Sequence, residues 1–178
     1  MTDTTNPMRG IRVQKLTLNI GVGKDQVALE KAQKLLNTIS GVTSVRTITQ
    51  ERIAAWGLRP GLPIGVKVTL RKDQAKTLIP KLLYAKDNKL GENNFDDNGN
   101  VSFGIKEYID IKDVKYDPDI GSMGLQCSVT LERPGFRIKS RKILKRVIPL
   151  SHRIPKTEAI KFMKEKFGAI LASDDEDK

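Results

Sequence analysis

The chain has 178 residues, 32 Lys and Arg against 21 Asp and Glu, and a formal net charge of +11. This length is sufficient for one domain with a buried core. No apolar run approaches the roughly 18 residues of a membrane span, so we expect no membrane partner. One Cys forms no internal disulfide and completes no zinc site, and the first residues lack the apolar core of a signal peptide. Together these features predict a reducing, cytoplasmic setting.

The charge is distributed in blocks along the chain. Residues 1–86 carry a net charge of +10, residues 87–119 carry −5, residues 120–172 carry +9 and residues 173–178 carry −3. Such blocks predict a basic side, which is the candidate interface for a polyanion, and an acidic patch. The densest basic run, residues 133–146, contains Arg133, Arg137, Lys139, Arg141, Lys142, Lys145 and Arg146 without an acid. Phosphate is its expected partner, and a solvated charged face is the alternative.

The chain begins with the pattern of a strand followed by a helix. Residues 15–20 alternate polar and apolar side chains, as a strand with one buried face does. Residues 25–40 have apolar side chains at helical spacing, with Asp25 as a possible N-cap and Gly41 as a possible C-terminal stop. We therefore expect an amphipathic helix packed beside the first strand.

Two further strands are expected at residues 42–49 and 64–71, where β-branched and alternating patterns occur. The connection between them, residues 50–63, is rich in turn-forming residues and too long for a tight hairpin. It is expected to project from the domain.

The middle of the chain predicts one helix and two short strands. Residues 72–86 have a helical pattern with Asp73 as a cap, in which Pro80 indicates a kink or a late start. An Asn-Gly turn precedes an expected strand at residues 101–105, and residues 108–111 are a candidate for another short strand.

The clearest strand lies at residues 123–132, where apolar and polar side chains alternate strictly, and the last helix is expected at 157–167 with Gly168 as its stop. Strands and helices mixed without regular βαβ alternation favour an α+β fold, an antiparallel sheet with helices packed on one face and a free polar face. We divide the chain into a flexible N-terminal segment (1–10), a single domain (11–172) and an acidic tail (173–178).

No motif in the chain specifies catalysis. The Gly21–Lys24 turn has one residue between its glycines and Asp after its Lys, so it lacks the spacing of a phosphate loop. Residues 96–100 resemble the start of a calcium loop, but Val101 replaces the required Gly, so a hairpin turn is favoured. Cys127 is assigned to the core and His152 to the surface. We expect no cofactor, no metal site and no enzymatic activity.

Four ordered motifs strongly resemble the archaeal-type form of large-subunit ribosomal protein five. They are LTLNIGVG (16–23), PIGVKVTLR (63–71), NFDDNGNVSFGIKEYIDI (94–111) and YDPDIGSMGLQCSVTLERPG (116–135). The resemblance covers roughly residues 8–168. It implies a structural protein of the large ribosomal subunit that binds 5S rRNA, attaches it in the central protuberance, contributes to a bridge with a small-subunit head protein and approaches P-site tRNA.

The resemblance also implies which residues contact 5S rRNA. The RNA-facing positions of the family correspond to Asn19 and Thr69, and strand periodicity places both on the polar side. Lys15, Thr17, Lys67 and Arg71 share the same strand faces and complete the expected 5S rRNA-binding set. A third contact position of the family, often Gln, corresponds to Val42, whose side chain forms no hydrogen bond.

The remaining expected contacts lie in the connection 50–63 and in the run 133–146. The resemblance places the connection near P-site tRNA, where Arg52 and Arg59 are expected at phosphates. Trp56 either stacks on a nucleotide or packs locally and stiffens the loop. The basic run is assigned to ribosomal RNA. The acidic block 87–119 either faces a basic neighbouring ribosomal protein or is a solvated surface.

Two other function classes remain open from the sequence. A nucleotide-dependent or RNA-modifying enzyme is motivated only by the Gly21–Lys24 turn and the positive charge. A non-specific DNA-compacting protein shares the charge but leaves the four motifs unexplained.

Overall fold

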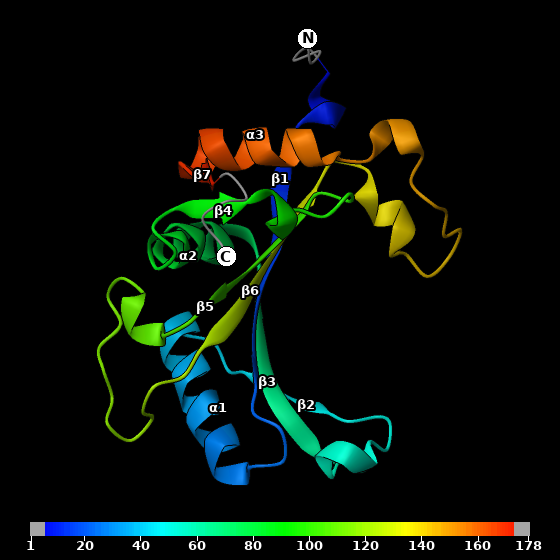
Figure 1. Ribbon diagram of the computed structural model, residues 1–178. Helices are drawn as coiled ribbons and strands as arrows, with labels where there is room; N and C mark the ends of the chain where they lie inside the picture. Colours follow the sequence, from blue (N-terminus) through cyan, green and yellow to red (C-terminus); the bar gives the residue numbers. More distant parts are fainter. Residues whose placement is uncertain (1–5, 173–178) are drawn as a thin grey trace.

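The computed structural model describes residues 6–172 and contains a five-stranded antiparallel sheet (Figure 1). The strands lie in the order β2 (Val45–Ile48), β3 (Pro63–Leu70), β1 (Arg12–Gly21), β6 (Leu125–Glu132), β5 (Asn100–Ile105). A separate parallel pair consists of β4 (Lys89–Gly91) and β7 (Ile170–Ala172). The helices are α1 (Gln26–Ser40), α2 (Lys72–Tyr84) and α3 (Lys156–Phe167). The predicted tail 173–178 and half of the segment 1–10 lie outside the described residues.

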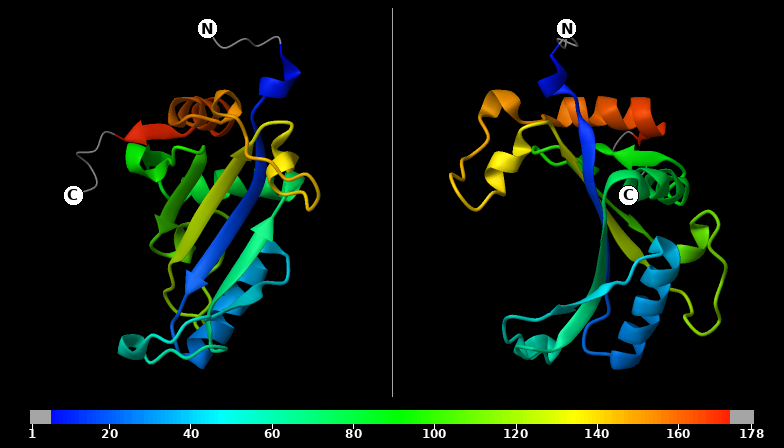
Figure 2. Two further views of the ribbon diagram at one scale, coloured as in Figure 1. Left: turned by 90° about the vertical axis from the view of Figure 1, so that its right-hand side faces the viewer. Right: turned by 180° about the vertical axis from the view of Figure 1, so that it is seen from behind.

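The helices α1 and α2 cover one face of the sheet and leave the other uncovered (Figure 2). Figure 2 shows β5, β6, β1 and β3 from the uncovered side, with no helix in front of them. The predicted α+β fold with a free face is therefore confirmed. Within residues 6–172, no helix combines the length and apolar character needed to cross a membrane.

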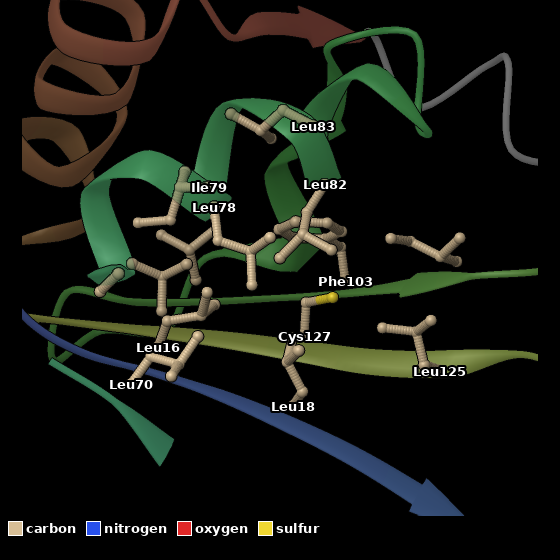
Figure 3. Close-up of a cluster of buried hydrophobic side chains, with 14 of the residues drawn as sticks. Leu16, Leu18, Leu70, Leu78, Ile79, Leu82, Leu83, Phe103, Leu125 and Cys127 are labelled. Carbon is tan, nitrogen blue, oxygen red and sulfur yellow. The ribbon is translucent and has the colours of Figure 1, made fainter. Parts of the chain in front are cut away.

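The core lies between the covered face of the sheet and the helices. Leu16 and Leu18 of β1 are fully buried, and Cys127 of β6 is 1% exposed. Figure 3 shows these side chains meeting α2, which contributes Ile79 and Leu82. Burial of each large apolar side chain stabilises the fold by about 1.5–3 kcal/mol. Cys127 is therefore part of the core, as predicted, and its burial raises the pKa of the thiol.

The boundaries of α1 agree with its predicted capping residues. The Asp25 carboxylate accepts hydrogen bonds from the backbone N–H groups of Val27 and Ala28, at 2.9 and 3.4 Å. Gly41 ends the helix with a φ of 65°, a left-handed conformation that Gly adopts without steric cost. Local sequence alone therefore specifies both ends of this helix.

Two local predictions are wrong. Asp73 is not the cap of α2: Arg71 occupies the N-cap position, and Asp73 lies in the first turn, where it accepts a hydrogen bond from Lys76 at 3.2 Å. The helix begins at Lys72 and contains Pro80, so the late start is excluded and the kink stays a prediction. Residues 108–110 form a 3-10 helix and not a strand. The reason is that Tyr108 is fully buried and its hydroxyl accepts the backbone N–H of Asp117 at 3.0 Å, which turns the chain away from the sheet.

Candidate nucleic-acid interface

The uncovered side of the sheet carries an array of polar side chains, which we call the polar face. Strand pairing aligns its members in rows that cross several strands. One row contains Lys67, Asn19 and Gln126; the next contains Thr69, Thr17, Ser128 and Ser102; the third contains Lys15, Thr130 and Asn100. All of these side chains are exposed or half-buried. The array therefore presents ammonium groups beside short hydroxyl and amide groups.

Hydrogen bonds between strands hold part of the polar face in place. The Asn19 amide donates to Oε1 of Gln126 at 3.2 Å. The hydroxyls of Ser102 and Ser128 lie 3.0 Å apart and share a hydrogen bond. Each of these groups retains further donor or acceptor capacity, because an amide or hydroxyl forms more than one hydrogen bond. This part of the face is thus held in place without a ligand.

The structure brings five of the six predicted 5S rRNA-binding residues together on the polar face: Lys15, Thr17, Asn19, Lys67 and Thr69. Arg71 lies just beyond the end of β3, exposed, at the N-terminus of α2. The sequence prediction missed the members that β5 and β6 contribute. The strict alternation at residues 123–132 carried a sufficient signal, since it placed Gln126, Ser128 and Thr130 opposite the core positions.

The connection between β2 and β3, residues 50–62, forms a projecting tip loop. Its base is closed by the Thr49 N–H, which donates to the Leu62 carbonyl at 2.9 Å. Arg52 and Arg59 are exposed, and Trp56 is 69% exposed. This exposure favours stacking over local packing, the two roles considered for Trp56. The indole is available for stacking.

One basic residue near the tip loop was not predicted. Lys24, in the turn between β1 and α1, places its Nζ 3.9 Å from the position that a Cβ would occupy at Gly57 of the tip loop. The turn therefore adds a third cation to the region of Arg52 and Arg59. No local pattern signals this proximity, because the two segments are more than 30 residues apart.

A second projection, the arm (residues 136–153), carries six cations of the predicted basic run. All are exposed: Arg137, Lys139, Arg141, Lys142, Lys145 and Arg146. The arm and the tip loop both extend from the sheet on the side away from α1 and α2 (Figures 1 and 2). Two basic projections therefore flank the polar face.

The seventh member of the run, Arg133, differs from the others, and its predicted contact with RNA needs correction. Its side chain is 4% exposed, forms an ion pair with Glu158 of α3, and donates to the carbonyl of Arg153 at 3.2 Å. These contacts engage both terminal nitrogens of the guanidinium at the base of the arm. Arg133 is consequently an anchor of the arm and is not available to phosphate.

His152 also belongs to the base of the arm and not to the open surface on which it was predicted. Its ring packs edge-on against Phe136, with 5.7 Å between the ring centroids. Its Nε2 lies 2.9 Å from the carbonyl oxygen of Pro134, which accepts the hydrogen bond. The ring therefore joins the two ends of the arm.

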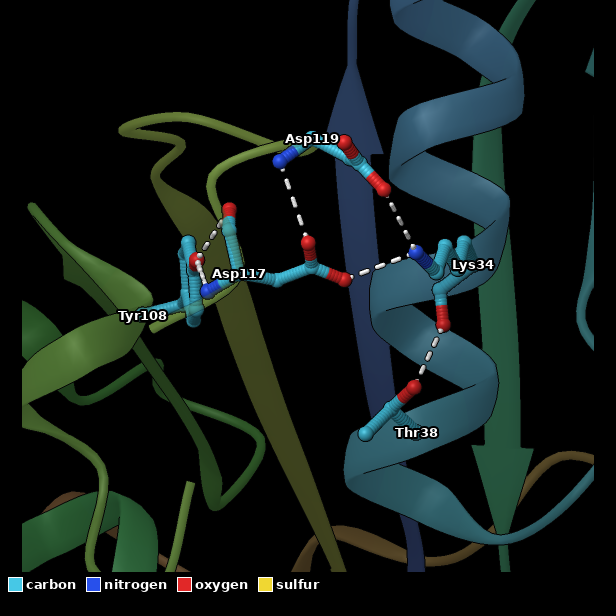
Figure 4. Close-up of polar contacts among 5 residues, drawn as sticks. All are labelled: Lys34, Thr38, Tyr108, Asp117 and Asp119. Carbon is cyan, nitrogen blue, oxygen red and sulfur yellow. Dashed lines mark hydrogen bonds and ion pairs between the residues drawn. The ribbon is translucent and has the colours of Figure 1, made fainter. Parts of the chain in front are cut away.

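The acidic block contributes ion pairs on the helix side of the molecule. Lys34 of α1 contacts Asp117 at 2.7 Å and Asp119 at 3.6 Å (Figure 4), and Lys81 of α2 contacts Asp113 at 2.8 Å. The hydrogen bond to Asp117 raises the pKa of Lys34. The Lys34 and Lys81 ammonium groups lower the pKa values of Asp117 and Asp113 respectively. Part of the negative charge is thus paired within the chain, away from the polar face.

Comparison with known proteins identifies the family. Residues 63–162 match the model of the C-terminus of the ribosomal L5 family, and residues 6–59 match that of ribosomal protein L5. Large ribosomal subunit protein uL5 of Sulfurisphaera tokodaii is 45% identical over 171 residues, which cover 96% of this chain and 97% of that protein. Its counterpart in Nanoarchaeum equitans is 49% identical over 164 residues, covering 92% and 96%. The chain therefore belongs to the ribosomal protein L5 family and is a structural protein of the large subunit of the cytoplasmic ribosome, not an enzyme.

Proposed function

We propose that this protein binds 5S rRNA through its polar face and attaches it in the central protuberance of the large ribosomal subunit. The observation that carries the proposal is the uncovered polar face between two basic projections. RNA helices display phosphates and 2′-hydroxyls, and proteins recognise them by shape through cations and short polar side chains. Lys15 and Lys67 supply the cations here, while Asn19, Thr17 and Thr69 supply the short groups.

The two projections extend this interface to other RNA molecules. In our proposal the arm contacts large-subunit rRNA with its six exposed cations. The tip loop approaches P-site tRNA, where Arg52 and Arg59 bind phosphates and Trp56 stacks on a base or sugar. The exposure of Trp56 supports this role, since a 69% exposed side chain is accessible to a nucleotide.

The helix side of the molecule is the proposed site of protein contacts. It carries the acidic loop of residues 106–121, which lies away from the polar face and so does not oppose RNA binding there. A small-subunit head protein at an inter-subunit bridge, or a basic neighbouring large-subunit protein, is the proposed partner. Attraction between surfaces of opposite charge supports this assignment.

The proposal is tested by measuring the affinity of the purified protein for 5S rRNA over a range of salt concentrations. Each neutralised phosphate is expected to change the slope of log K against log salt by roughly 0.7 to 0.9. Binding should weaken steeply as salt rises. Absent or salt-independent binding by the folded protein contradicts the proposal, and equal affinity for duplex DNA supports non-specific compaction instead.

Specificity is tested with Asn19→Ala and Thr69→Ala. Both variants remove short polar groups without removing charge, so they are expected to weaken binding of 5S rRNA more than binding of an RNA of random sequence. Lys67→Ala is the matched control, because loss of a phosphate contact weakens both RNAs similarly. If Asn19→Ala and Thr69→Ala, like Lys67→Ala, weaken binding of 5S rRNA and of the random RNA equally, Asn19 and Thr69 have no specific role.

A further inference from the structure

A hollow of about 700 Å³ lies between the arm and the turn that precedes β5. Its floor is apolar and consists of Phe136, Ile148 and Ile154, each at most 7% exposed. Gly99 has a φ of 76°, and a Cβ at this position would lie 2.8 Å from Cβ of Ile154. The turn therefore lies directly against the floor. A hollow of this size is within the range that holds small ligands.

The rim of the hollow is cationic. Lys139, Lys145, Arg146 and Arg153 line it. The Nζ of Lys139 lies over the Phe136 ring, 5.1 Å from its centroid, so one charge faces the floor directly. Among the described residues, no carboxylate forms an ion pair with Lys145 or Arg146, so their charges are available to an anion.

Two side-chain amides complete the lining and connect the hollow to the polar face. Asn98 belongs to the turn before β5, and Asn100 is the first residue of β5. The Asn100 amide nitrogen donates to Asp96 at 3.0 Å, which leaves its carbonyl oxygen as an acceptor. Asn100 also pairs with Thr130 in the third row of the polar face. A ligand strand that follows the polar face therefore arrives at the hollow.

We propose that the hollow holds one unpaired nucleotide of the bound RNA, an inference that rests on the function proposed above. A nucleotide has a flat apolar base, a polar base edge and a phosphate. The hollow offers a counterpart for each: the apolar floor, the Asn98 and Asn100 amides, and the cationic rim. Proteins recognise unstacked bases in single-stranded RNA in this way. The carboxylates of an acidic peptide would pair with the cationic rim, but such a peptide has no group that matches the amides or the apolar floor.

The proposal is tested by NMR of methyl groups with two probes. Hexaadenylate is the single strand, and a fully paired RNA with the same number of phosphates is the control. We expect hexaadenylate to shift the methyl signals of Val147 and Ile148, which line the hollow, in a saturable manner. The methyls of Ile143, 77% exposed on the same arm but outside the hollow, should move little. Equal shifts with the paired RNA, with a glutamate hexapeptide, or at Ile143 overturn the proposal.

Lys145→Glu and Lys142→Glu form a matched pair, since both residues are exposed on the arm but only Lys145 lines the hollow. Lys145→Glu is expected to weaken hexaadenylate binding roughly tenfold and Lys142→Glu only about twofold. Equal losses overturn the proposal. If the protein binds 5S rRNA but hexaadenylate shifts no methyl signal, only the proposal of a nucleotide site in the hollow is overturned. If the folded wild-type protein binds no RNA at all, both proposals are overturned.

Discussion

The two faces of the sheet are built from alternate residues of the same strands, yet they have different roles. In β1, Leu18 is fully buried against α2, while its neighbours Thr17 and Asn19 lie on the polar face. Side chains on the covered face contribute to stability by burial. Those on the polar face form a few hydrogen bonds with one another, and their remaining donors and acceptors are available to a ligand. Fold stability and RNA binding are therefore expected to respond to different substitutions.

The largest expected difference is between the free energies of unfolding of Leu18→Ala and Thr17→Ala. Leu18→Ala removes a fully buried side chain and should lower the free energy of unfolding by about 2–5 kcal/mol. Thr17→Ala lies on the polar face, where such a substitution changes stability by about 1 kcal/mol or less. Urea unfolding measures both changes.

The affinity for 5S rRNA should respond in the reverse order, when it is measured at a temperature where both variants are folded. Thr17→Ala is expected to weaken binding, whereas folded Leu18→Ala should bind like the wild type. A large stability loss in Thr17→Ala would show that the polar face also holds the fold together.

A smaller difference in stability is expected between two substitutions within the basic run. Arg133→Ala removes the contacts with Glu158 and with the Arg153 carbonyl, and should lower the free energy of unfolding by about 1–3 kcal/mol. Arg137→Ala removes an exposed cation and should leave stability nearly unchanged while it weakens RNA binding. Thermal unfolding and salt-dependent RNA binding measure the two effects. A stable Arg133→Ala variant with weakened RNA binding would reverse our assignment of Arg133.

The contrast between Arg133 and Arg137 shows what local sequence can and cannot predict. Both belong to one basic run, and nothing within residues 133–146 distinguishes them. The difference depends on Glu158, which lies 25 residues farther along the chain. Polar and apolar alternation in β1, β3 and β6 was predictable because neighbouring residues in a strand point to opposite faces. Burial of a charge depends on tertiary packing, which the local pattern does not contain.

Two short strands were not predicted from the sequence, whereas the ends of α1 were. The strands β4 and β7 have three residues each, too few to show a period, and they pair across about 80 residues of chain. The ends of α1 were predictable because Asp25 and Gly41 act on the backbone beside them. The tip loop was expected to project, but the position of Lys24 beside Gly57 required the folded structure.

The smallest expected effect concerns the helix side, which lies across the sheet from the polar face. Lys34→Ala removes the ammonium group that is the main cause of the lowered pKa of Asp117. The pKa of Asp117 should therefore rise toward its ordinary value, although the Asp119 N–H still hydrogen-bonds the carboxylate at 3.0 Å. Carboxyl chemical shifts measured across pH report this change. The pKa of Asp113 depends mainly on Lys81 and serves as the internal control.

The sign of the pH effect follows from the direction of the shift. A carboxyl group with a lowered pKa in the folded state stabilises the fold above its ordinary pKa, and this contribution is lost as the pH falls through the folded value. Lys34→Ala should reduce that acid-dependent loss slightly, because the pair is exposed. Since Lys34 lies on the covered side, the affinity for 5S rRNA at neutral pH should change little. A large loss of affinity would mean that the helix side also contacts RNA.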